Sequence, residues 1–469
     1  MVNTVLPYFP ASSTVAVVGL GKIGLPLAVQ YALHGHRVIG CDINPGVVGS
    51  VNAGKSSIQE EPELATKVAR VVEGGLLSAT VQTTEAVRNA KVVVVIVPVV
   101  IDARHEVSFD SIDASTREIG AGLQPGTLVI YETTLPVGTT SQRFRGILES
   151  TSNLQADRDF YLAYSPERVS SGSIFRDLRT YPKIVGGINV QSTTAAVAFY
   201  RSVLDAEIIT MSSSDEAEFV KLIETTYRDV NIALANEFAC FADAHGLDVA
   251  AAIAGANTQP YSHIHSPGVG VGGHCIPIYP YFLLAGAEKT PYIDYPMLML
   301  PRYARQINDA MAEYAVRRIE GITGSLAGQS VLILGVTYRG DVRAVAFTSA
   351  NLLQDALLDR GATVYADDPL FSADELDALG FTPFTPVVEG EIRAIIVQAN
   401  HKAYQSFDFS RFVNCQVVLD GRKALCHEKI ESLSTRYAFI GDGVREQLDW
   451  RQRERQSILA SSLLNGGEQ

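Results

Sequence analysis

The 469-residue sequence predicts an α/β protein with two doubly wound, parallel-sheet domains joined by a helical central domain. Three observations support this prediction. Short β-branched runs alternate with helical patterns from residue 14 onward, and again from residue 330 onward. Between these regions, residues 214–245 contain no proline and predict one long helix. The chain is also too long for a single core, so we expect several domains.

The composition argues against several classes of protein. Hydrophobic residues make up 47% and charged residues 19% of the chain, which is typical of globular domains and not of disordered segments. A net charge of -13 disfavours a broad nucleic-acid or anionic-membrane surface. The five cysteines lack the spacing of a metal site or a disulfide framework, and we recognise neither a signal peptide nor a membrane-spanning run. We therefore expect a cytoplasmic protein without a metal, a nucleic-acid partner or a membrane partner.

The first predicted strand, residues 14–19, runs directly into the glycine motif G-L-G-K-I-G, and a helix is expected over residues 25–33. In such a motif the first glycine makes the tight turn, the second lets a pyrophosphate approach the backbone, and the third lets the helix pack on the strand. The motif predicts a Rossmann-like domain that binds a dinucleotide. The residues expected to bind the cofactor at this turn are Gly19, Gly21, Lys22, Ile23 and Gly24.

A second predicted strand, residues 36–42, ends at Asp42, about 20 residues beyond the glycines. A carboxylate at this position accepts hydrogen bonds from a ribose 2'-hydroxyl and repels a 2'-phosphate. The sequence therefore predicts NAD rather than NADP as the cofactor. A packing turn without a ligand is the alternative, but the order of strand, glycines, helix, strand and acid argues against it.

Further apolar runs predict strands of the same sheet at residues 91–97, 128–131 and 161–164. Each run is followed by a polar loop, and ligands of open parallel sheets bind beyond the carboxyl ends of the strands. These loops contain Pro98, Thr134 and Glu167, which are candidates for contact with cofactor or substrate. The alternative for Thr134 and Glu167 is that each side chain only caps its turn.

The helix predicted over residues 214–245 has Ser213 or Ser214 as its N-cap and would be about 45 Å long. Such a helix can bridge two domains and offer a surface for a dimer.

Lys221 and Thr225 lie four residues apart on one face of this helix, and Glu224 can pair with Arg228 on another. Lys221 is a catalytic candidate. The alternative is a solvated lysine paired with Glu218 or Glu224.

A glycine-rich stretch then displays a single thiol. The letters G-V-G-V-G-G-H precede Cys275, and a lone cysteine after small residues is a candidate nucleophile in a cytosolic protein. The alternative is that Cys275 is a small buried hydrophobe.

The second α/β region has strands predicted at residues 330–335, 362–365, 394–397 and 417–419, and a helix at residues 348–360. The run Gly335 to Arg339 stands in place of a glycine fingerprint, and Arg339 with backbone amides can hold a nucleotide phosphate. A lid domain without a ligand of its own is the alternative. Beyond Trp450 the charges alternate, and we expect a frayed tail.

Four motifs taken together resemble the nucleotide-sugar 6-dehydrogenase family of the UDP-glucose and GDP-mannose type. The motifs are E-T-T-L-P-V-G-T-T at 132–140, Y-S-P-E-R-V at 164–169, E-F-V-K-L-I-E-T-T-Y-R at 218–228 and G-V-G-G-H-C-I-P at 270–277. The resemblance covers nearly the whole chain and implies a homodimer. It implies an NAD-binding domain at 1–205, a dimerising domain with the cysteine loop at 206–322, a UDP-sugar-binding domain at 323–450 and a tail at 451–469.

The reaction that this resemblance implies is a four-electron oxidation of a sugar C6 alcohol to a carboxylate, with two NAD used per UDP-sugar. Cys275 would add to the intermediate aldehyde as a thiolate, and hydrolysis of the resulting thioester would release the acid. Lys221 would stabilise oxyanion charge, and Glu167 would assist proton transfer in the hydrolysis. Thr134 would lie beside the nicotinamide. The residues expected to bind the substrate are Glu167, Arg168, Lys221, Gly272 and Arg339.

The chain departs from the family pattern at two positions where the family usually has an Asn and an Asp. Thr225 stands four residues after the lysine, where its hydroxyl can still donate one hydrogen bond, so it stays a catalytic candidate. Tyr279 stands four residues after the cysteine and cannot act as a carboxylate base. Arg339 replaces a usual lysine and keeps a phosphate-binding cation.

The run P-E-R-V-S-S-G is closer to family members that act on UDP-N-acetylhexosamines of the manno or gluco series, with UDP-glucose as the second choice. Two other hypotheses stay open. One is a protein that binds NAD and a UDP-sugar but has lost catalysis through Thr225 and Tyr279, and the other is a two-electron dehydrogenase. The number of NADH formed per sugar separates the three.

Overall fold

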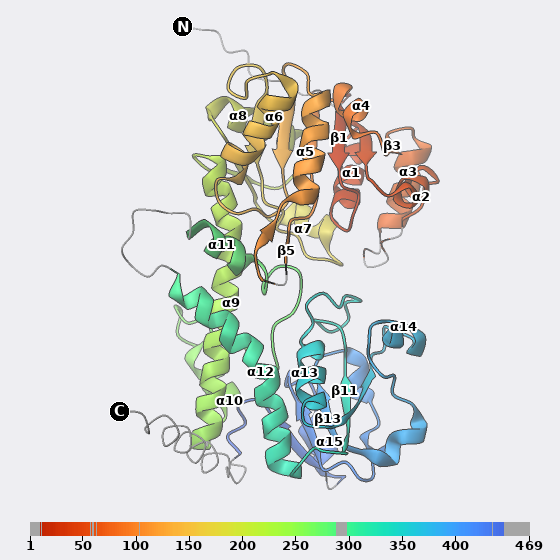
Figure 1. The fold of residues 1–469 in the computed structure, drawn as a ribbon, viewed down its shortest axis with the longest axis vertical. Helices are drawn as coiled ribbons and strands as arrows, with labels where there is room; N and C mark the ends of the chain where they lie inside the picture. The colour runs from red at the N-terminus through yellow and green to blue at the C-terminus, as the bar shows by residue number, and fades with distance from the viewer. Residues whose placement is uncertain are drawn as a thin grey trace, which may run out of the picture. The chain divides into compact units, whose positions relative to one another are not determined.

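The computed structural model describes residues 10, 12–56, 58, 61, 63–102, 104–287, 298–433 and 435–444 (Figure 1). The chain forms two compact units. The first unit contains Met1–Thr225 and Ile278–Met297, and the second contains Thr226–Pro277 and Leu298–Gln469. The predicted tail at 451–469 lies outside the described residues.

An eight-stranded sheet, with strand order β10-β9-β8-β7-β4-β1-β2-β3, forms the centre of the first unit. All neighbouring strands from β3 to β8 are parallel, whereas β9 is antiparallel to β8. The strands predicted in this region are confirmed as β1 (Thr14–Val18), β2 (Arg37–Cys41), β4 (Val92–Val95), β7 (Leu128–Tyr131) and β8 (Tyr161–Tyr164). The sequence patterns did not predict β3 (Leu77–Thr80), β9 (Lys183–Gly187), β10 (Ile208–Thr210) or the hairpin of β5 (Val100–Ile101) and β6 (Val107–Ser108).

Helices cover both faces of this sheet because successive residues of each strand point to opposite sides. Val15 and Val17 of β1 pack with α1, α3, α7 and α8, whereas Ala16 and Val18 pack with α4, α5 and α6. The helices of this unit are α1 (Gly24–Leu33), α2 (Pro45–Asn52), α3 (Leu64–Glu73), α4 (Thr83–Arg88), α5 (Asp110–Gly122), η1 (Thr139–Phe144), α6 (Arg145–Ser152), α7 (Ile174–Thr180), α8 (Val190–Val203) and α11 (Tyr279–Ala287).

The parallel strands of the first unit place their carboxyl ends at one edge of the sheet. The strand order reverses between β1 and β4, since β2 and β3 extend the sheet on one side and β7 and β8 on the other. Ligands of doubly wound sheets bind at such a switch point. Because β9 runs antiparallel to β8, its first residue, Lys183, also lies at this edge.

The second unit contains a five-stranded parallel sheet with the order β12-β11-β13-β14-β15. Helices α10, α12 and α13 share a core with one face of this sheet, and Tyr404 and Phe412 pack on the other. The strands and the helix predicted here are confirmed. Their bounds, with those of the neighbouring helices, are α10 (Val249–Ala256), α12 (Met299–Thr323), β11 (Ser330–Leu334), α13 (Ser349–Leu358), β12 (Thr363–Asp367), α14 (Ala373–Ala378), η2 (Pro386–Glu391), β13 (Ile392–Val397), η3 (Lys402–Ser406), η4 (Phe409–Arg411), β14 (Val417–Asp420), α15 (His427–Glu431) and β15 (Arg436–Phe439).

The long predicted helix is confirmed as α9 (Ser214–His245), which is continuous from the residues of the first unit into those of the second. Ser213 is the N-cap, because its Oγ accepts a hydrogen bond of 3.1 Å from the backbone N–H of Glu216. Gly246, with a φ of +73°, follows the last helical residue.

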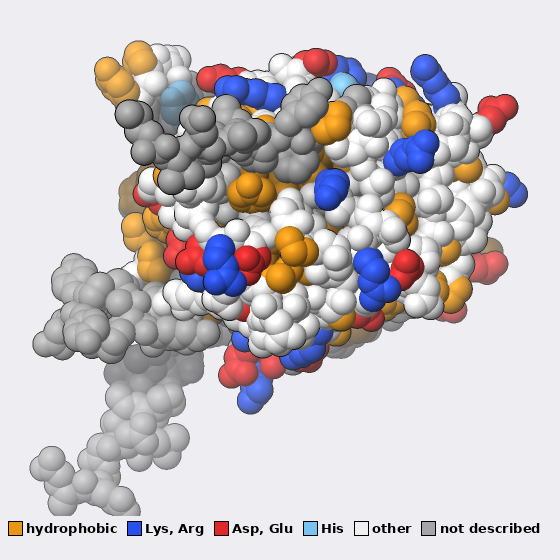
Figure 2. Space-filling view, turned by 90° about the horizontal axis from the view of Figure 1, so that it is seen from above, with side chains coloured by type: hydrophobic (Ala, Val, Ile, Leu, Met, Phe, Trp, Pro, Cys, Tyr) orange, Lys and Arg blue, Asp and Glu red, His pale blue; other side chains and the backbone are white. Residues whose placement is uncertain are grey.

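On the face shown in Figure 2, the Lys and Arg side chains lie among Asp and Glu side chains rather than in one continuous patch. Within the ranges that the structure describes, no helix is both long enough and apolar enough to cross a membrane.

Candidate active-site residues

The turn between β1 and α1 has the geometry that a bound pyrophosphate requires. Gly19 has a φ of +96°, and a Cβ on it would lie 2.8 Å from the carbonyl oxygen of Ile96. A Cβ on Gly24 would lie 1.8 Å from the carbonyl oxygen of Gly19, whereas a Cβ on Gly21 would meet no described atom within 4 Å. The fold therefore requires the first and third glycines, and the second leaves an open surface where a pyrophosphate can approach.

The N-terminus of α1 lies at this turn. Its N-cap, Ile23, makes no side-chain capping bond to the helix. The backbone N–H of Leu25 donates to the carbonyl oxygen of Gly21 at 3.2 Å and Pro26 has no N–H, so an anion at this end would meet the N–H of Gly24 and the positive end of the helix dipole. The neighbouring Lys22 side chain is exposed. These features fit the diphosphate of NAD, as the sequence predicts.

Asp42 follows β2 and is half-buried beside the glycine turn. Its Oδ2 accepts a hydrogen bond of 2.9 Å from the backbone N–H of Leu20, and its Oδ1 accepts one of 2.9 Å from Asn44. Each carboxylate oxygen keeps a further lone pair for a ribose hydroxyl. The structure thus adds an anchoring role for Asp42 to the expected contact with the ribose.

The loops after β4 and β7 lie side by side. The Thr133 hydroxyl donates a hydrogen bond of 2.8 Å to the carbonyl oxygen of Val97. Pro98 is exposed next to this bond, and the Thr134 side chain is buried. Both predicted cofactor-binding residues therefore lie at the ligand-binding edge of the sheet.

Glu167 lies just beyond β8 and is held through both carboxylate oxygens. Its Oε1 accepts hydrogen bonds from the backbone N–H groups of Arg168 and Val169, at 2.7 and 3.2 Å. Its Oε2 accepts a hydrogen bond of 2.9 Å from Nζ of Lys183, which also donates to Oε2 of Glu132 at 2.7 Å. Burial opposes the ionisation of Glu167, but the Lys183 charge and the hydrogen bonds outweigh it, so the pKa of Glu167 lies below its ordinary value.

Arg168, an expected substrate-binding residue, makes an ion pair within the first unit. Its Nε donates to Oε2 of Glu224 at 2.9 Å, and its Nη1 donates to the carbonyl oxygen of Pro182 at 3.2 Å. Glu224 therefore pairs with Arg168, and the pairing with Arg228 that helical spacing allows does not form.

Lys221 is 7% exposed, and its ammonium has no carboxylate partner within the described chain. The two acids that could have paired with it are engaged elsewhere. Glu224 binds Arg168, and Glu218 accepts hydrogen bonds from the backbone N–H groups of Gly138 and Thr140. The structure therefore excludes the alternative of a solvated Lys221 paired on its own helix.

Thr225 uses its hydroxyl proton within α9. Its Oγ1 donates to the carbonyl oxygen of Lys221 at 2.9 Å. Donation to an oxyanion, as the sequence suggests, would require this hydroxyl to leave the helix carbonyl. The oxygen of Thr225 can still accept a hydrogen bond.

In the second unit, Cys275 is a half-buried free thiol that follows the glycine-rich loop. A Cβ on Gly272 would lie 2.7 Å from Cβ of Tyr338, and a Cβ on Gly270 would lie 2.7 Å from Cβ of Ser349. The backbone N–H of Gly273 donates to the carbonyl oxygen of Ala346 at 2.8 Å. The glycines thus let the loop pack closely against residues 338–349.

A buried network anchors the start of the same loop. Oδ1 of Asn236 accepts a hydrogen bond of 2.9 Å from the backbone N–H of Gly268. The Asn236 amide donates to Asn308 at 2.9 Å, and the Asn308 amide donates to Asp229 at 2.8 Å. All three network side chains are buried, so the backbone that leads to Cys275 is fixed by groups that cannot exchange with water.

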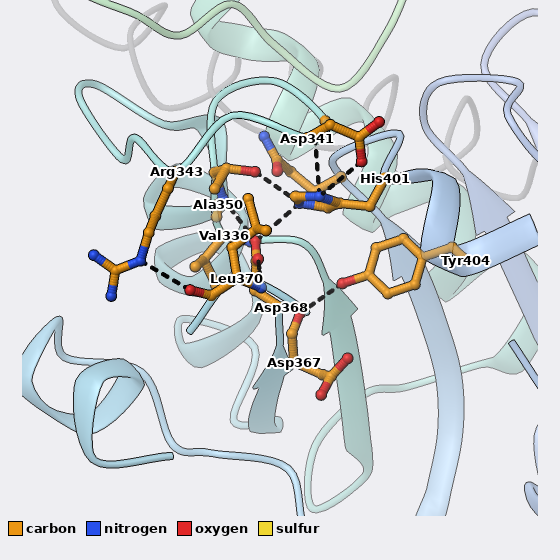
Figure 3. Close-up of polar contacts among 12 residues, drawn as sticks. Val336, Asp341, Arg343, Ala350, Asp367, Asp368, Leu370, His401 and Tyr404 are labelled. Atoms are coloured by element: carbon orange, nitrogen blue, oxygen red, sulfur yellow. Dashed lines mark hydrogen bonds and ion pairs between the residues drawn. The ribbon is translucent and has the colours of Figure 1, made fainter. Parts of the chain in front are cut away.

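Arg339 is exposed on the loop that follows β11. Figure 3 shows the side chains that hold this loop. Nε2 of the buried His401 contacts Oγ1 of Thr337 at 2.8 Å and Oδ2 of Asp368 at 3.1 Å, and its Nδ1 accepts a hydrogen bond from the backbone N–H of Asp341. Asp368 also accepts from the backbone N–H of Val336 at 2.8 Å. The base of the loop is therefore fixed, and its exposed cation is free to contact a phosphate.

A cavity of about 360 Å³ opens in the second unit beside the carboxyl end of β14. It is lined by α10, by the loop at 264–267 and by residues 420–423. Nε of Arg422 donates to the carbonyl oxygen of Gln398 at 2.8 Å, and its Nη2 donates to that of Gly270 at 3.2 Å. Burial lowers the pKa of Arg422 to about 10, although the charge of Asp420 acts in the opposite direction.

The sequence matches all three domains of one protein family. The NAD binding domain of the UDP-glucose/GDP-mannose dehydrogenase family matches residues 13–204, the central domain residues 215–310 and the UDP binding domain residues 332–427. The chain belongs to the UDP-glucose/GDP-mannose dehydrogenase family. It is an oxidoreductase that uses NAD and acts on a UDP-sugar, as the motifs imply.

Relatives of this dehydrogenase span nearly its whole length. UDP-N-acetyl-D-mannosamine dehydrogenase of Pyrococcus horikoshii is 33% identical over 418 residues, which are 88% of this chain and 96% of the relative. The structure of UDP-D-ManNAc dehydrogenase from the same organism has a TM-score of 0.82 at 31% identity and covers 92% of this chain and 99% of its own. A UDP-glucose dehydrogenase structure from Pyrobaculum islandicum has a TM-score of 0.82 at 25% identity. The match covers 93% of this chain and 99% of the Pyrobaculum chain.

The site residues expected for this dehydrogenase divide between its two units. Those for NAD lie in the first unit with Thr134, Glu167, Arg168, Lys221 and Thr225, whereas Gly272, Cys275 and Arg339 lie in the second. Across the described ranges, no cluster of three His, Cys, Asp or Glu side chains could hold a metal ion.

Sequence reasoning missed three charged residues of the dehydrogenase, namely Glu132, Lys183 and Arg422. Glu132 and Arg422 follow the carboxyl end of a strand, and that position is the signal that could have identified them. Lys183 is the first residue of β9 and reaches the ligand-binding edge of its sheet only because β9 runs antiparallel to β8, which its sequence does not indicate.

Proposed function

We propose that this dehydrogenase oxidises the C6 alcohol of a UDP-N-acetylhexosamine to a carboxylate in two successive two-electron steps. The observation that carries the proposal is the half-buried free thiol of Cys275, on a loop packed against the UDP binding domain in a chain that also has an NAD turn. The sugar is inferred to be UDP-N-acetyl-D-mannosamine, because the Pyrococcus relative carries that name. UDP-glucose is the alternative, which the Pyrobaculum structure supports.

Cys275 is proposed as the nucleophile. Its thiolate sulfur forms a bond to the C6 aldehyde carbon, and the product is a hemithioacetal whose carbon can lose a second hydride. Bound NAD is the hydride acceptor in each oxidation. Water then attacks the thioester carbon, the carbon–sulfur bond breaks, and the acid and the thiolate are released.

Lys221 and Glu167 are proposed to act on the charge and the protons of this sequence. A buried ammonium without a carboxylate partner stabilises negative charge on the C6 oxygen more strongly than a paired one would. Glu167 accepts a proton from the attacking water, and Thr134 is placed beside the nicotinamide. Thr225 is proposed to assist as a hydrogen-bond acceptor near Lys221.

Arg339 is proposed to bind the diphosphate of the UDP-sugar, and the cavity beside Arg422 to receive another part of the nucleotide. Both lie in the segment that matches the UDP binding domain. Arg168 and Gly272 are proposed as additional substrate contacts through their backbone, because the Arg168 side chain is bound to Glu224 and the Cβ position of Gly272 is filled by Tyr338.

A homodimer formed through α9 is also proposed. Large apolar side chains are exposed along this helix at intervals of three to seven residues, and the spacing suits the seam of a second helix. These side chains are Phe219, Ile223, Tyr227, Leu234, Phe238 and Phe241.

We propose domain boundaries at 1–205, 206–322 and 323–450, which the three separate family matches support. We also propose a cytoplasmic location, which the five free cysteines support.

The test of the nucleophile is Cys275→Ala. We expect no acid product from this variant when the UDP-sugar and NAD are supplied, because no thioester can form. Cys426→Ala, which removes an exposed cysteine elsewhere in the second unit, is the matched control and should retain full activity. A normal acid yield from Cys275→Ala, measured by mass spectrometry of the product, would overturn the proposal.

A further inference from the structure

A buried cluster of three charges lies at the ligand-binding edge of the first sheet. Nζ of Lys183 is 2.7 Å from Oε2 of Glu132 and 2.9 Å from Oε2 of Glu167. The side chains of Lys183, Glu132 and Glu167 are 6%, 0% and 11% exposed. One ammonium is therefore shared between two carboxylates that water barely reaches.

The direction of β9 explains why these residues meet. The antiparallel ladder pairs Ala163 with Gly187 and Tyr164 with Gly186. Extending this register by three residues on each strand places Glu167 opposite Lys183. Glu132 follows β7, the parallel neighbour of β8, so its side chain reaches the same ammonium from the other side.

The cluster is electrostatically unequal. Burial raises the pKa of Glu132, and the charge of Glu167 raises it further, although Lys183 acts in the opposite direction. Burial lowers the pKa of Lys183, but the two carboxylates outweigh it and leave this pKa above the ordinary value. Glu132 also accepts hydrogen bonds from the hydroxyls of Tyr31 and Tyr200, at 3.0 and 2.6 Å.

The hydrogen bonds of Glu167 fix the orientation of its carboxylate. Its Oε1 accepts two backbone N–H bonds, and its Oε2 accepts the bond from Lys183. The Glu132 carboxyl is a further hydrogen-bond partner that lowers the pKa of Glu167. Lys183 is therefore one of the groups that orient Oε2.

We propose that Lys183 is a positioning residue for Glu167, with Glu132 holding the Lys183 ammonium in place. Lys183 fixes Oε2 of Glu167 and keeps this carboxylate ionised, so that it can accept a proton from the water that hydrolyses the Cys275 thioester. In that step a water O–H bond breaks, the proton moves to Oε2, the oxygen bonds to the thioester carbon, and the sulfur leaves as a thiolate. The inference rests on the function proposed above for Glu167.

Glu132 and Glu167 are the two carboxyl groups of this cluster, and the pKa of the first is raised whereas that of the second is lowered. Burial raises the pKa of Tyr31, Tyr164 and Tyr200 well above the ordinary value, so these three hydroxyls stay neutral. The groups that face Glu167 from the surrounding elements are Tyr31 of α1, Glu132 after β7, Tyr164 of β8, Arg168, Lys183 of β9 and, through Arg168, Glu224 of α9. Tyr200 of α8 contacts Glu132.

The experiment compares the pH dependence of kcat in two variants whose profiles should move in opposite directions. Lys183→Met leaves two carboxylates without a cation, so the acidic limb of the profile should move up by about one pH unit or more. Glu132→Gln removes the competing carboxylate, so the acidic limb should move down. If Lys183 only supported the fold, its substitution would lower kcat at every pH without moving the acidic limb of the profile.

Two further readouts separate positioning from folding. Lys183→Met should accumulate the thioester on Cys275, seen as added mass on quenched protein, while its KM for NAD stays within about threefold of wild type. Lys183→Arg, which restores the cation, should return the profile towards wild type. Lys91→Met, at an exposed lysine of the same unit, is the control and should change neither quantity.

The outcomes distinguish this inference from the proposed function. A wild-type protein that forms no acid from any UDP-sugar overturns the function, and the inference with it. An active wild type whose profile is unchanged in both Lys183→Met and Glu132→Gln overturns the inference alone. An infrared titration of the Glu167 carboxyl gives a check without turnover, because its pKa should rise in Lys183→Met and fall in Glu132→Gln.

Discussion

Asp42 stabilises the glycine turn and is proposed to select the cofactor as well. Its carboxylate holds the backbone N–H groups of Leu20 and Asn44, and so fixes the turn on which we propose that the pyrophosphate lies. The same charge would repel a phosphate on the ribose 2'-oxygen. We therefore propose that a residue that stabilises the turn also sets the preference for NAD.

We expect Asp42→Asn to lower the preference for NAD over NADP. The substitution removes the repelling charge while keeping the size of the side chain, so the ratio of kcat/KM for NAD to that for NADP should fall by about tenfold or more. Steady-state kinetics with both cofactors measures this ratio. Asp110→Asn, at the start of α5, is the control, and an unchanged ratio in Asp42→Asn would show that another group selects the cofactor.

The glycine turn and Asp42 could be predicted because their chemistry depends on residues close together in the sequence. The lack of a carboxylate partner for Lys221 among the described residues could not be predicted. It arises because Glu218 accepts hydrogen bonds from Gly138 and Thr140, which lie 80 and 78 residues away along the chain. Helical spacing left Glu218 as a plausible partner for Lys221, and only tertiary contacts decide between the two.

At the level of elements, Glu218 links α9 to the loop after β7, and this link should depend on pH. Burial raises the pKa of Glu218 to about 8, although the hydrogen bonds from Gly138 and Thr140 act in the opposite direction. A raised pKa in the folded state means that the folded protein binds the proton more tightly than the unfolded chain. The stability contribution of Glu218 is therefore complete below its unfolded pKa of about 4.5 and is lost as the pH rises through about 8.

We expect the stability difference between wild type and Glu218→Gln to shrink as the pH rises from about 5 to about 9. The glutamine does not titrate, so only the wild type loses this contribution. Urea unfolding of both proteins at several pH values measures the difference. A difference that stays constant or grows over this range would contradict the account.

The loop that carries Arg339 depends on Asp368, which accepts hydrogen bonds from the backbone N–H groups of Val336 and Thr337 and contacts His401. Asp368 also accepts one from the backbone N–H of Leu370. In Asp368→Asn we expect a looser loop, with KM for the UDP-sugar raised by about tenfold and kcat within about threefold of wild type. Asp374→Asn, at an exposed position in α14, is the control. Loss of kcat without a change in KM would place Asp368 outside substrate binding.

The strands and α9 could be predicted from local patterns, whereas the direction of β9 and the cavity in the second unit could not. Lys183–Gly187 has the composition of any buried strand, and nothing within it indicates that it runs antiparallel to β8. The cavity combines α10 with the end of β14, and Arg422 contacts a glycine that precedes it by 152 residues. Such long-range pairings follow from packing and not from a single segment.

At the scale of the whole molecule, the exposed apolar side chains of α9 test the proposed dimer. We expect Tyr227→Lys combined with Phe238→Lys to shift the protein to a monomer, since charge repulsion would replace apolar burial at the interface. Phe347→Lys, which changes an exposed aromatic outside α9, is the matched control. Sedimentation velocity gives the mass of each species, and a double variant that remains dimeric would exclude this face of α9.

The central claim is that one chain carries out both oxidations of the sugar. The measurement that tests it most directly is the number of NADH formed per UDP-sugar consumed, with UDP-N-acetyl-D-mannosamine, UDP-N-acetylglucosamine and UDP-glucose as substrates. We predict two NADH per sugar, with the carboxylate as product and UDP-N-acetyl-D-mannosamine as the best substrate. One NADH per sugar would identify a two-electron dehydrogenase, and binding of NAD and UDP-sugar without NADH would identify a protein that has lost catalysis; either result would contradict the account.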